Sequence, residues 1–391
     1  MSDDVRKKIR ELTAEEKTET FDTHPSLSER IASARRTNAR GTFHDGRPAS
    51  CLFRDFDATS EYSTMLFYRQ IFGNQLDLNL IHDVNDLVEK QKVANLAFES
   101  LNRVTQGSYS FRRPLVLGHQ EFTDELPRTT STQELRRLRL AIEASAGPYE
   151  TLRGKWGTTE ELRMLVAQSS LLQQAGFKVP KNLFDPPLVN PQQCDALWES
   201  TNQTRAQLDS QMKAHEEALA KRINLTLAIL DRATEDEFPG RDLLDGIADR
   251  MCHSYAAMRE QVEMVLSFRE RFTALSALVN SGSSKGHNPP EFPGTLQRVL
   301  AETAAMLGQL RRALVHHPYP FDHATANLSI GEFLIKQVPT SDDLPGVAAT
   351  IEKLLEEFPR LYVRIFGQIC WVCEQVETWL DLPLAAEPKR E

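Results

Sequence analysis

Residues 206–230 read AQLDSQMKAHEEALAKRINLTLAIL. Apolar side chains recur in this stretch at intervals of three and four residues, a spacing that places them on one face of an α-helix. The pattern continues in both directions and predicts one long helix over residues 191–233. We assign its apolar face to Ala206, Leu208, Met212, Ala218, Leu219, Ile223, Leu225, Leu227 and Leu230.

A second helical pattern, over residues 241–280, offers a partner for that face. Its apolar positions are Met251, Tyr255, Met258, Val262, Val265, Leu266, Phe268 and Phe272. The sequence DEFPGRD between the two patterns contains Pro239 and Gly240, which suit a turn between helices. The sequence therefore predicts an all-α fold, a multi-helix bundle with two long antiparallel helices.

Shorter helical patterns surround this pair. The strand-like segment 108–118 contains Pro114, which is a poor strand residue, so at most a minor strand element is expected there. Four prolines in residues 176–191, GFKVPKNLFDPPLVNP, indicate a linker. We predict three parts: residues 1–75, a helical domain at 76–180, and a C-terminal helical bundle at 190–385. The shorter helices are expected at 57–72, 83–105, 130–144, 158–175, 294–316, 343–358 and 360–380.

Composition and charge exclude some classes of function. The 391 residues carry a net charge of −9, and no long Lys/Arg run is present, so nucleic-acid binding is not expected. No apolar run approaches the roughly 18 residues of a membrane helix, and the charged N-terminus lacks the apolar core of a signal peptide. The five scattered cysteines suit a reducing compartment, and we therefore expect a cytoplasmic chain.

The His215-Glu216 pair is the one place where a zinc-protease motif could begin. In a His-Glu-x-x-His motif, two histidines one helical turn apart bind the metal, and the glutamate activates a water molecule. Leu219 occupies the position of the second histidine. We therefore interpret this stretch as a solvated part of a long helix, and we assign no catalytic residue in this chain.

The segment 316–323, HHPYPFDH, is the densest group of metal-binding residue types. Three imidazoles and a carboxylate could bind zinc or a similar ion, and two prolines would stiffen the turn. The spacing matches no standard metal motif, so a structural turn is the alternative. The candidate ligands are His316, His317, Asp322 and His323.

Three further patterns each have a structural and a functional interpretation. Cys370 and Cys373 have redox or metal spacing, but they lie within an apolar helical pattern, so we expect buried, inert thiols. The basic cluster could contact an acidic partner or lipid head groups, or could be a solvated helix face. The acidic pairs could bind a divalent ion, but helix capping is preferred. The basic cluster is Arg128, Arg136, Arg137 and Arg139, and the acidic pairs are Asp55 with Asp57 and Asp342 with Asp343.

Residues Asp22 to Ile31 read DTHPSLSERI, and residues 41–73 read GTFHDGRPASCLFRDFDATSEYSTMLFYRQIFG. The first stretch resembles the signature that closes the protease domain of HtpX-like (gluzincin) membrane zinc metalloproteases. The second resembles the segment that follows it in large bacterial members. By position, Thr23, His24, Pro25, Glu29, Arg30 and Ile31 correspond to the closing motif, which packs beside the catalytic domain and supplies no metal ligand.

The resemblance implies that zinc belongs to an upstream catalytic domain, and that this chain has no cofactor of its own. It also implies a place on the cytoplasmic face of the inner membrane, with membrane attachment only through upstream segments. Our first hypothesis is therefore a non-catalytic helical region of a membrane metalloprotease, which docks partners, positions substrate or regulates the protease.

Two other hypotheses remain open. The chain could be a self-standing helical interaction or scaffold protein, with another protein as its partner. It could also be a metal-binding enzyme centred on the HHPYPFDH turn. The extensive apolar faces of residues 191–233 and 241–280 leave self-association into a homo-oligomer as an option under each hypothesis.

Overall fold

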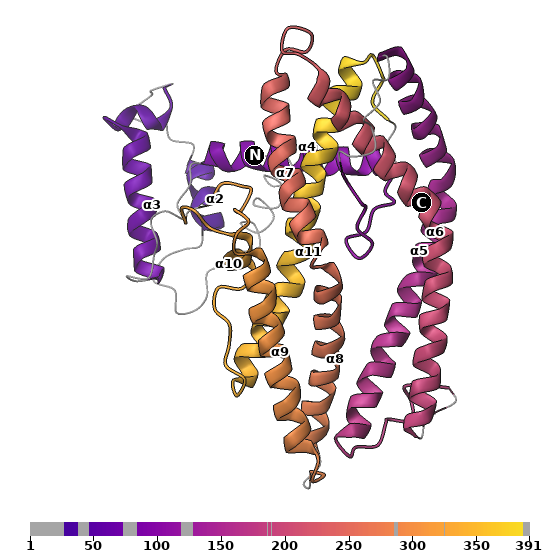
Figure 1. The fold of residues 1–391 in the computed structure, drawn as a ribbon. Coiled ribbons are helices and arrows are strands. Elements are labelled where there is room, and N and C mark those ends of the chain that lie inside the picture. Colours follow the sequence, from indigo (N-terminus) through magenta and orange to yellow (C-terminus); the bar gives the residue numbers. More distant parts are fainter. Residues whose placement is uncertain are drawn as a thin grey trace. The chain divides into compact units, whose positions relative to one another are not determined.

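The computed structural model describes residues 27–37, 47–72, 84–118, 128–185, 187–188, 190–284, 288–323 and 325–385. Within these ranges every regular element is helical, apart from one isolated bridge between Pro318 and Ser329. The all-α prediction is therefore confirmed (Figure 1). The chain divides into two compact units, Met1–Ile81 and His82–Glu391.

The first unit contains α2 (Leu27–Thr37), the short 3-10 helix η1 (Ala49–Leu52) and α3 (Phe56–Phe72). Asp55 precedes α3 and its carboxylate accepts a hydrogen bond of 2.9 Å from the backbone N–H of Ala58. Such a bond satisfies one of the free N–H groups at a helix start. The predicted capping role of Asp55 is thus confirmed.

The second unit contains the long helices. They are α4 (Val84–Thr105), α5 (Arg128–Gln174), α6 (Pro191–Arg232), α7 (Arg241–Arg259), α8 (Val262–Ser284), α9 (Phe292–Leu314), α10 (Ile330–Leu334) and α11 (Leu344–Trp379). The two longest, α5 and α6, lie side by side (Figure 1). Tyr149 of α5 contacts His215, whereas Arg163 contacts Trp198, so the helices run antiparallel.

The predicted helix over 241–280 is two helices. The chain leaves α7 at Arg259 and enters α8 at Val262, and the N–H of Gln261 bonds to the carbonyl of Met258 at 3.0 Å. Met258 and Val262 are both buried. No glycine or proline marks this break, so the continuous apolar pattern on both sides of it concealed the end of one helix.

At two other places the sequence predicts two helices and the structure has one long helix. α5 replaces two shorter predicted helices and continues through Pro148, and α11 does the same through Pro359. A proline inside a helix removes one backbone hydrogen bond. Apolar contacts continue on both sides of the interruption: Phe358 and Leu361, for example, are both buried around Pro359. Tertiary packing therefore outweighs the local cost of each proline.

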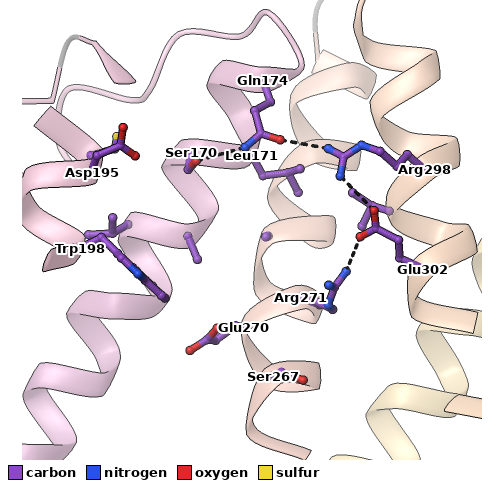
Figure 2. Close-up of a pocket in the computed structure, with 15 residues that line it drawn as sticks. Ser170, Leu171, Gln174, Asp195, Trp198, Ser267, Glu270, Arg271, Arg298 and Glu302 are labelled. Atoms are coloured by element: carbon purple, nitrogen blue, oxygen red, sulfur yellow. Dashed lines mark hydrogen bonds and ion pairs between the residues drawn. The ribbon is translucent and has the colours of Figure 1, made fainter. Parts of the chain in front are cut away.

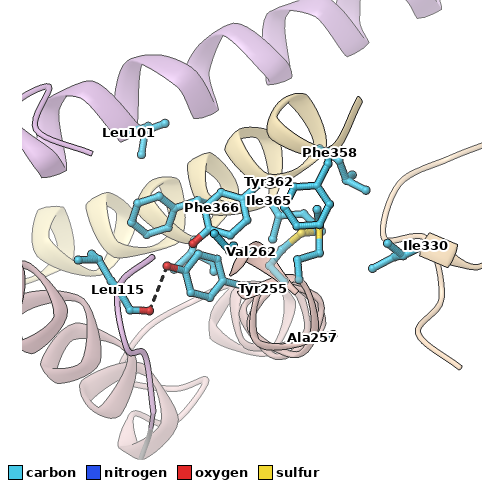
Figure 3. Close-up of a cluster of buried hydrophobic side chains, with 14 of the residues drawn as sticks. Leu101, Leu115, Tyr255, Ala257, Val262, Ile330, Phe358, Tyr362, Ile365 and Phe366 are labelled. Atoms are coloured by element: carbon cyan, nitrogen blue, oxygen red, sulfur yellow. Dashed lines mark hydrogen bonds between the residues drawn. The ribbon is translucent and has the colours of Figure 1, made fainter. Parts of the chain in front are cut away.

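α11 is the helix around which the second unit is built. It packs against α4, α6, α7, α8, α9 and α10. Its buried face includes Val347, Ile351, Leu354, Phe358, Leu361, Tyr362, Ile365, Phe366 and Ile369. Each such side chain contributes about 1.5–3 kcal/mol when it is fully buried. Figure 3 shows part of this core, where Tyr362 and Phe366 of α11 meet Tyr255 of α7.

The segment 108–118 has no strand partner in the described part of the chain. Two of its backbone groups bind side chains of neighbouring helices. The carbonyl of Leu115 accepts a hydrogen bond from the hydroxyl of Tyr255 at 3.2 Å (Figure 3). The N–H of Gly118 donates to the Asn224 side chain at 3.1 Å. These contacts fix an irregular segment against α6 and α7.

The second unit contains residues 82–180 together with residues 190–385, and the predicted division between a helical domain and a C-terminal bundle stays a prediction. One cluster of buried side chains includes Leu138 of α5, Ile223 of α6 and Phe366 of α11. The proline-rich segment therefore connects two packed helices of one core. Among the described residues, no helix has both the length and the apolar character needed to cross a bilayer.

Candidate functional site: a groove beside closed polar clusters

The HHPYPFDH turn is held by backbone bonds and aromatic packing. The N–H of Tyr319 donates to the carbonyl of Leu328, and the N–H of Ile330 donates to the carbonyl of His317, each at 2.8 Å. The guanidinium of Arg364 lies 3.7 Å from the ring centre of Phe321. These contacts belong to a structural turn that joins α9 to α10.

The candidate ligands in this turn differ in their exposure to solvent. His316, Asp322 and His323 are exposed, and His317 is half-buried. Across the described residues, no group of three or more His, Cys, Asp or Glu side chains is placed to hold a metal ion. The geometry does not support a metal site at these four residues, and the metal hypothesis stays a prediction.

The interpretation of His215 as a solvated residue is wrong. Its side chain is only 6% exposed and stacks on the ring of Tyr149, with ring centres 4.4 Å apart. Nε2 lies 2.7 Å from the hydroxyl of Ser108, and Nδ1 lies 2.7 Å from the hydroxyl of Ser145. His215 thus joins α6 to α5 and to the segment after α4.

Burial sets the charge of His215. The Ser145 hydroxyl lies 2.7 Å from the carbonyl of Ala141, and the Ser108 hydroxyl bonds to the carbonyl of Thr105. A neutral imidazole has one N–H, so one serine accepts from the ring, and the other donates its single hydroxyl hydrogen to the ring in place of the carbonyl. Burial lowers the pKa of His215 to about 4, which makes the ring neutral at pH 7.

This constellation does not provide a catalytic site. The cavity beside Ser108, Tyr149 and Tyr255 has a volume of about 10 Å³. That volume holds about one water molecule and no substrate. Leu219, where a zinc motif requires histidine, is 1% exposed in the core. The stretch from His215 to Leu219 therefore does not fit a zinc ion.

Glu216 is part of a second closed cluster. Its carboxylate accepts hydrogen bonds from Arg113 at 2.6 and 2.9 Å and from the Tyr149 hydroxyl at 3.0 Å. Arg113 also bonds to Asp209, which accepts a bond of 2.9 Å from the indole N–H of Trp156. These groups satisfy one another and fix the segment around Arg113 to α5 and α6.

The predicted basic cluster on α5 separates into different environments. Arg136 and Arg137 are exposed, and Arg137 binds Glu134 one turn away at 2.7 Å. Arg139 faces inward: it lies 3.5 Å from Glu377 and donates to the carbonyl of Pro383 at 2.6 Å. The solvated-face interpretation therefore holds for the first two arginines and is wrong for Arg139.

Cys370 and Cys373 of α11 lie in the core, where burial disfavours the reactive thiolate form. Cys370 and Cys373 are fully buried, and burial raises the pKa of both thiols. A thiol that remains protonated at neutral pH is a poor nucleophile and a poor metal ligand. The prediction that both cysteines are buried is confirmed, and their lack of reactivity stays a prediction. The capping prediction also holds for Asp343, whose carboxylate accepts from Gly346 N–H at 2.9 Å.

The residues of the family-like motif lie in the first unit. Glu29, Arg30 and Ile31 are on α2 and are exposed. Thr23, His24 and Pro25 lie outside the described residues.

A groove of about 440 Å³ opens among the helices of the second unit. It lies between α5, α6, α8 and α9 (Figure 2). Its volume is within the range of natural ligand sites. Apolar side chains from three helices contribute to its lining, including Val166, Ala167 and Leu171 of α5, Ala274 of α8 and Val299 of α9.

The α9 side of the groove carries a complete chain of polar bonds. Glu302 accepts hydrogen bonds from Arg271 at 3.0 Å and from Arg298 at 3.2 Å, and Arg298 also donates to Gln174 at 3.0 Å (Figure 2). The two arginines lower the pKa of Glu302. This side is therefore charged but internally satisfied.

The opposite side of the groove carries Asp195 and Trp198 of α6 and Glu270 of α8. The ring of Trp198 has the guanidinium of Arg163 at 4.5 Å from its centre. Arg163 binds Glu160 at 2.9 Å and approaches Glu270 only to 3.8 Å. Burial raises the pKa of Glu270, as expected for a carboxylate without a close cation.

No pattern in the sequence predicts this groove. Its lining residues come from four helices, and the first and last of them, Val166 and Glu302, are 136 positions apart, so no local motif indicates them. No family model, curated protein or solved structure matches this chain, so its own geometry is the basis for any functional proposal.

Proposed function

We propose that residues 82–391 are a non-catalytic helical docking domain, and that the groove between α5, α6, α8 and α9 receives a segment of a partner protein. The groove is the observation that carries this proposal. It combines apolar walls with charged side chains, the usual composition of a site that binds a defined ligand.

The closed polar clusters support a role in binding. His215, Glu216 and Arg113 have the residue types of a reactive site, but each is held by internal partners. A catalytic acid, base or nucleophile must reach a substrate atom within hydrogen-bond distance. The small cavity beside Ser108 does not allow that approach.

We further propose that the domain serves an HtpX-like membrane zinc metalloprotease as a cytoplasmic accessory region. The family-like stretches, residues 22–31 and 41–73, fall inside the first compact unit. The helical domain begins directly after that unit. This order is the one expected if a helical docking domain follows the end of a protease domain.

The native polypeptide in its source cells tests this proposal. An antibody against the helical domain would be used to precipitate the protein from soluble and from detergent-solubilised membrane fractions. We expect a membrane-associated band larger than 44.3 kDa, or co-precipitation of a separate membrane protease, with chelator-sensitive cleavage of a casein substrate in either case. A 44.3 kDa band confined to the soluble fraction, without protease, would instead favour a self-standing interaction protein.

A further inference from the structure

The two sides of the groove differ in their electrostatic state. On the α9 side, Glu302 is shared between two arginines at 3.0 and 3.2 Å. On the other side, the carboxylate of Glu270 makes no hydrogen bond within the described residues, and its ion-pair contact with Arg163 is 3.8 Å long. A charge-assisted hydrogen bond is about 1 Å shorter than that contact.

Arg163 is already engaged elsewhere. Its Nη1 donates to Glu160 at 2.9 Å, and its guanidinium lies over Trp198 at 4.5 Å. It is a buried side chain whose position is fixed by these two contacts. Arg163 therefore neutralises Glu270 only in part, and Asp195 adds a second carboxylate to the same side of the groove.

From this asymmetry we infer that the groove recognises an arginine side chain presented by an extended segment of the partner protein. The guanidinium of that side chain would bind between Glu270 and Asp195, beside Trp198. This inference rests on the proposed docking function and adds the chemistry of the ligand to it. Figure 2 shows the three residues on the side of the groove away from Arg298.

The chemistry of the lining favours arginine over a small cation. The methylene groups of an arginine can pack on apolar surface such as Val166, Ala167 and Ala274 while the charged end reaches the carboxylates. A planar guanidinium can donate two parallel bonds to one carboxylate and can also stack against an aromatic ring. The volume of about 440 Å³ accommodates such a side chain together with neighbouring backbone.

Fluorine NMR of the full chain gives a direct test, because the chain contains four tryptophans and Trp198 lines the groove. The protein would be labelled with 5-fluorotryptophan, and the Trp198→Phe variant would assign the resonance. The probes are three blocked tripeptides, Ala-X-Ala, in which X is arginine, its uncharged analogue citrulline, or glutamate. We expect a saturable shift of the Trp198 resonance with the arginine peptide only.

Matched variants identify the carboxylate. Glu270→Gln should weaken binding of the arginine peptide by roughly tenfold or more, because a charge-assisted bond becomes a neutral one. Glu352→Gln makes the same charge change at an exposed position of α11 outside the groove lining and should leave the affinity unchanged. Equal affinities of the Glu270→Gln variant and the unchanged chain would overturn the inference.

The outcomes separate this inference from the docking proposal. A saturable shift with the citrulline or glutamate peptide, equal to that with arginine, would mean that the groove docks a segment without selecting a cation. The docking function would then stand and the inference would fail. A Trp198 resonance that no peptide moves would overturn the inference, while precipitation from membranes would still decide the docking function.

Discussion

Arg222 and Glu377 form a two-pronged ion pair in the core of the helical domain. Nε and Nη2 of Arg222 each donate to a different oxygen of Glu377 at 2.8 Å, and Nη1 donates to the carbonyl of Val104 at 2.7 Å. Both side chains are at most 4% exposed. One turn earlier on α11, Glu374 holds Arg103 of α4 in the same two-pronged manner, at 2.8 Å.

Removal of one partner from the Arg222–Glu377 pair should strongly destabilise the domain. Glu377→Gln leaves the guanidinium buried without its counter-charge, and the expected loss is about 3–5 kcal/mol in the free energy of unfolding. Urea denaturation followed by circular dichroism measures it. The exposed pair Lys213–Glu217 provides the control, and Glu217→Gln should leave the midpoint nearly unchanged.

The double variant Arg222→Met/Glu377→Leu tests the cause of that loss. Apolar replacements of similar volume remove both desolvated charges together, and stability should recover most of what the single variant loses. If the double variant is as unstable as Glu377→Gln, packing and not the unpaired charge explains the effect.

Gly367 of α11 lies close to the backbone of α4. A Cβ atom at this position would lie 2.9 Å from the carbonyl oxygen of Ala97. Gly367→Ala should therefore push the helices apart and cost about 1–3 kcal/mol.

Gly154 of α5 has nothing within 4 Å of the position that a Cβ atom would take. Gly154→Ala should stabilise the chain by about 0.5–1 kcal/mol, because alanine is the better helix former.

Thermal or urea denaturation of both glycine variants measures these opposite changes on one scale. A Gly367→Ala variant as stable as Gly154→Ala would show that α4 can shift away from α11 without loss of packing.

The sequence predicts the helices of this fold better than it predicts their ends. The three- and four-residue spacing of apolar side chains correctly places α6 and α9. The pattern fails at Pro148 and Pro359, where packing carries the helix through a residue that usually ends it. It also fails at Gln261, where the helix ends without a glycine or proline nearby.

The same spacing also indicates that certain polar residues are buried. His215 follows Met212 by three positions and precedes Leu219 by four, so it lies on the apolar face of α6. Arg222 continues that face. A polar residue on such a face is usually buried with a partner. The groove has no comparable signal, because its walls meet only after four helices have packed.

Thiol reactivity should distinguish the cysteines sharply. Cys51 is exposed, whereas Cys194, Cys370 and Cys373 are buried. Burial also raises the pKa of the half-buried Cys252 to about 12, so little reactive thiolate forms there at neutral pH. A thiol reagent such as DTNB should modify one cysteine rapidly in the folded chain and all five after denaturation.

The Cys51→Ser variant is the control for that experiment and should lose the rapid phase. Rapid modification of Cys370 or Cys373 in the folded chain would contradict the inert role of the pair, and would reopen a redox function for α11.

The stability of the helical domain should fall as the pH drops from about 6.5 to about 4, because of His215. The folded chain holds this imidazole at a pKa of about 4, below its ordinary value of 6.5. Between these two values the unfolded chain binds a proton that the folded chain does not, so acidification favours unfolding. The contribution is complete above pH 6.5 and is lost as the pH approaches 4.

Urea midpoints measured from pH 7.5 to 4.5, for the unchanged chain and for His215→Gln, isolate this effect. Other groups titrate in the same range: burial raises the pKa of Glu270, which makes a contribution of opposite sign. That contribution is common to both proteins, so the difference between their slopes belongs to His215. The slope should be smaller in His215→Gln. If that variant fails to fold, a histidine ring resonance of the unchanged chain that titrates near 4 is the expected result, and titration of all ten histidines near 6.5 would contradict the neutral, buried state.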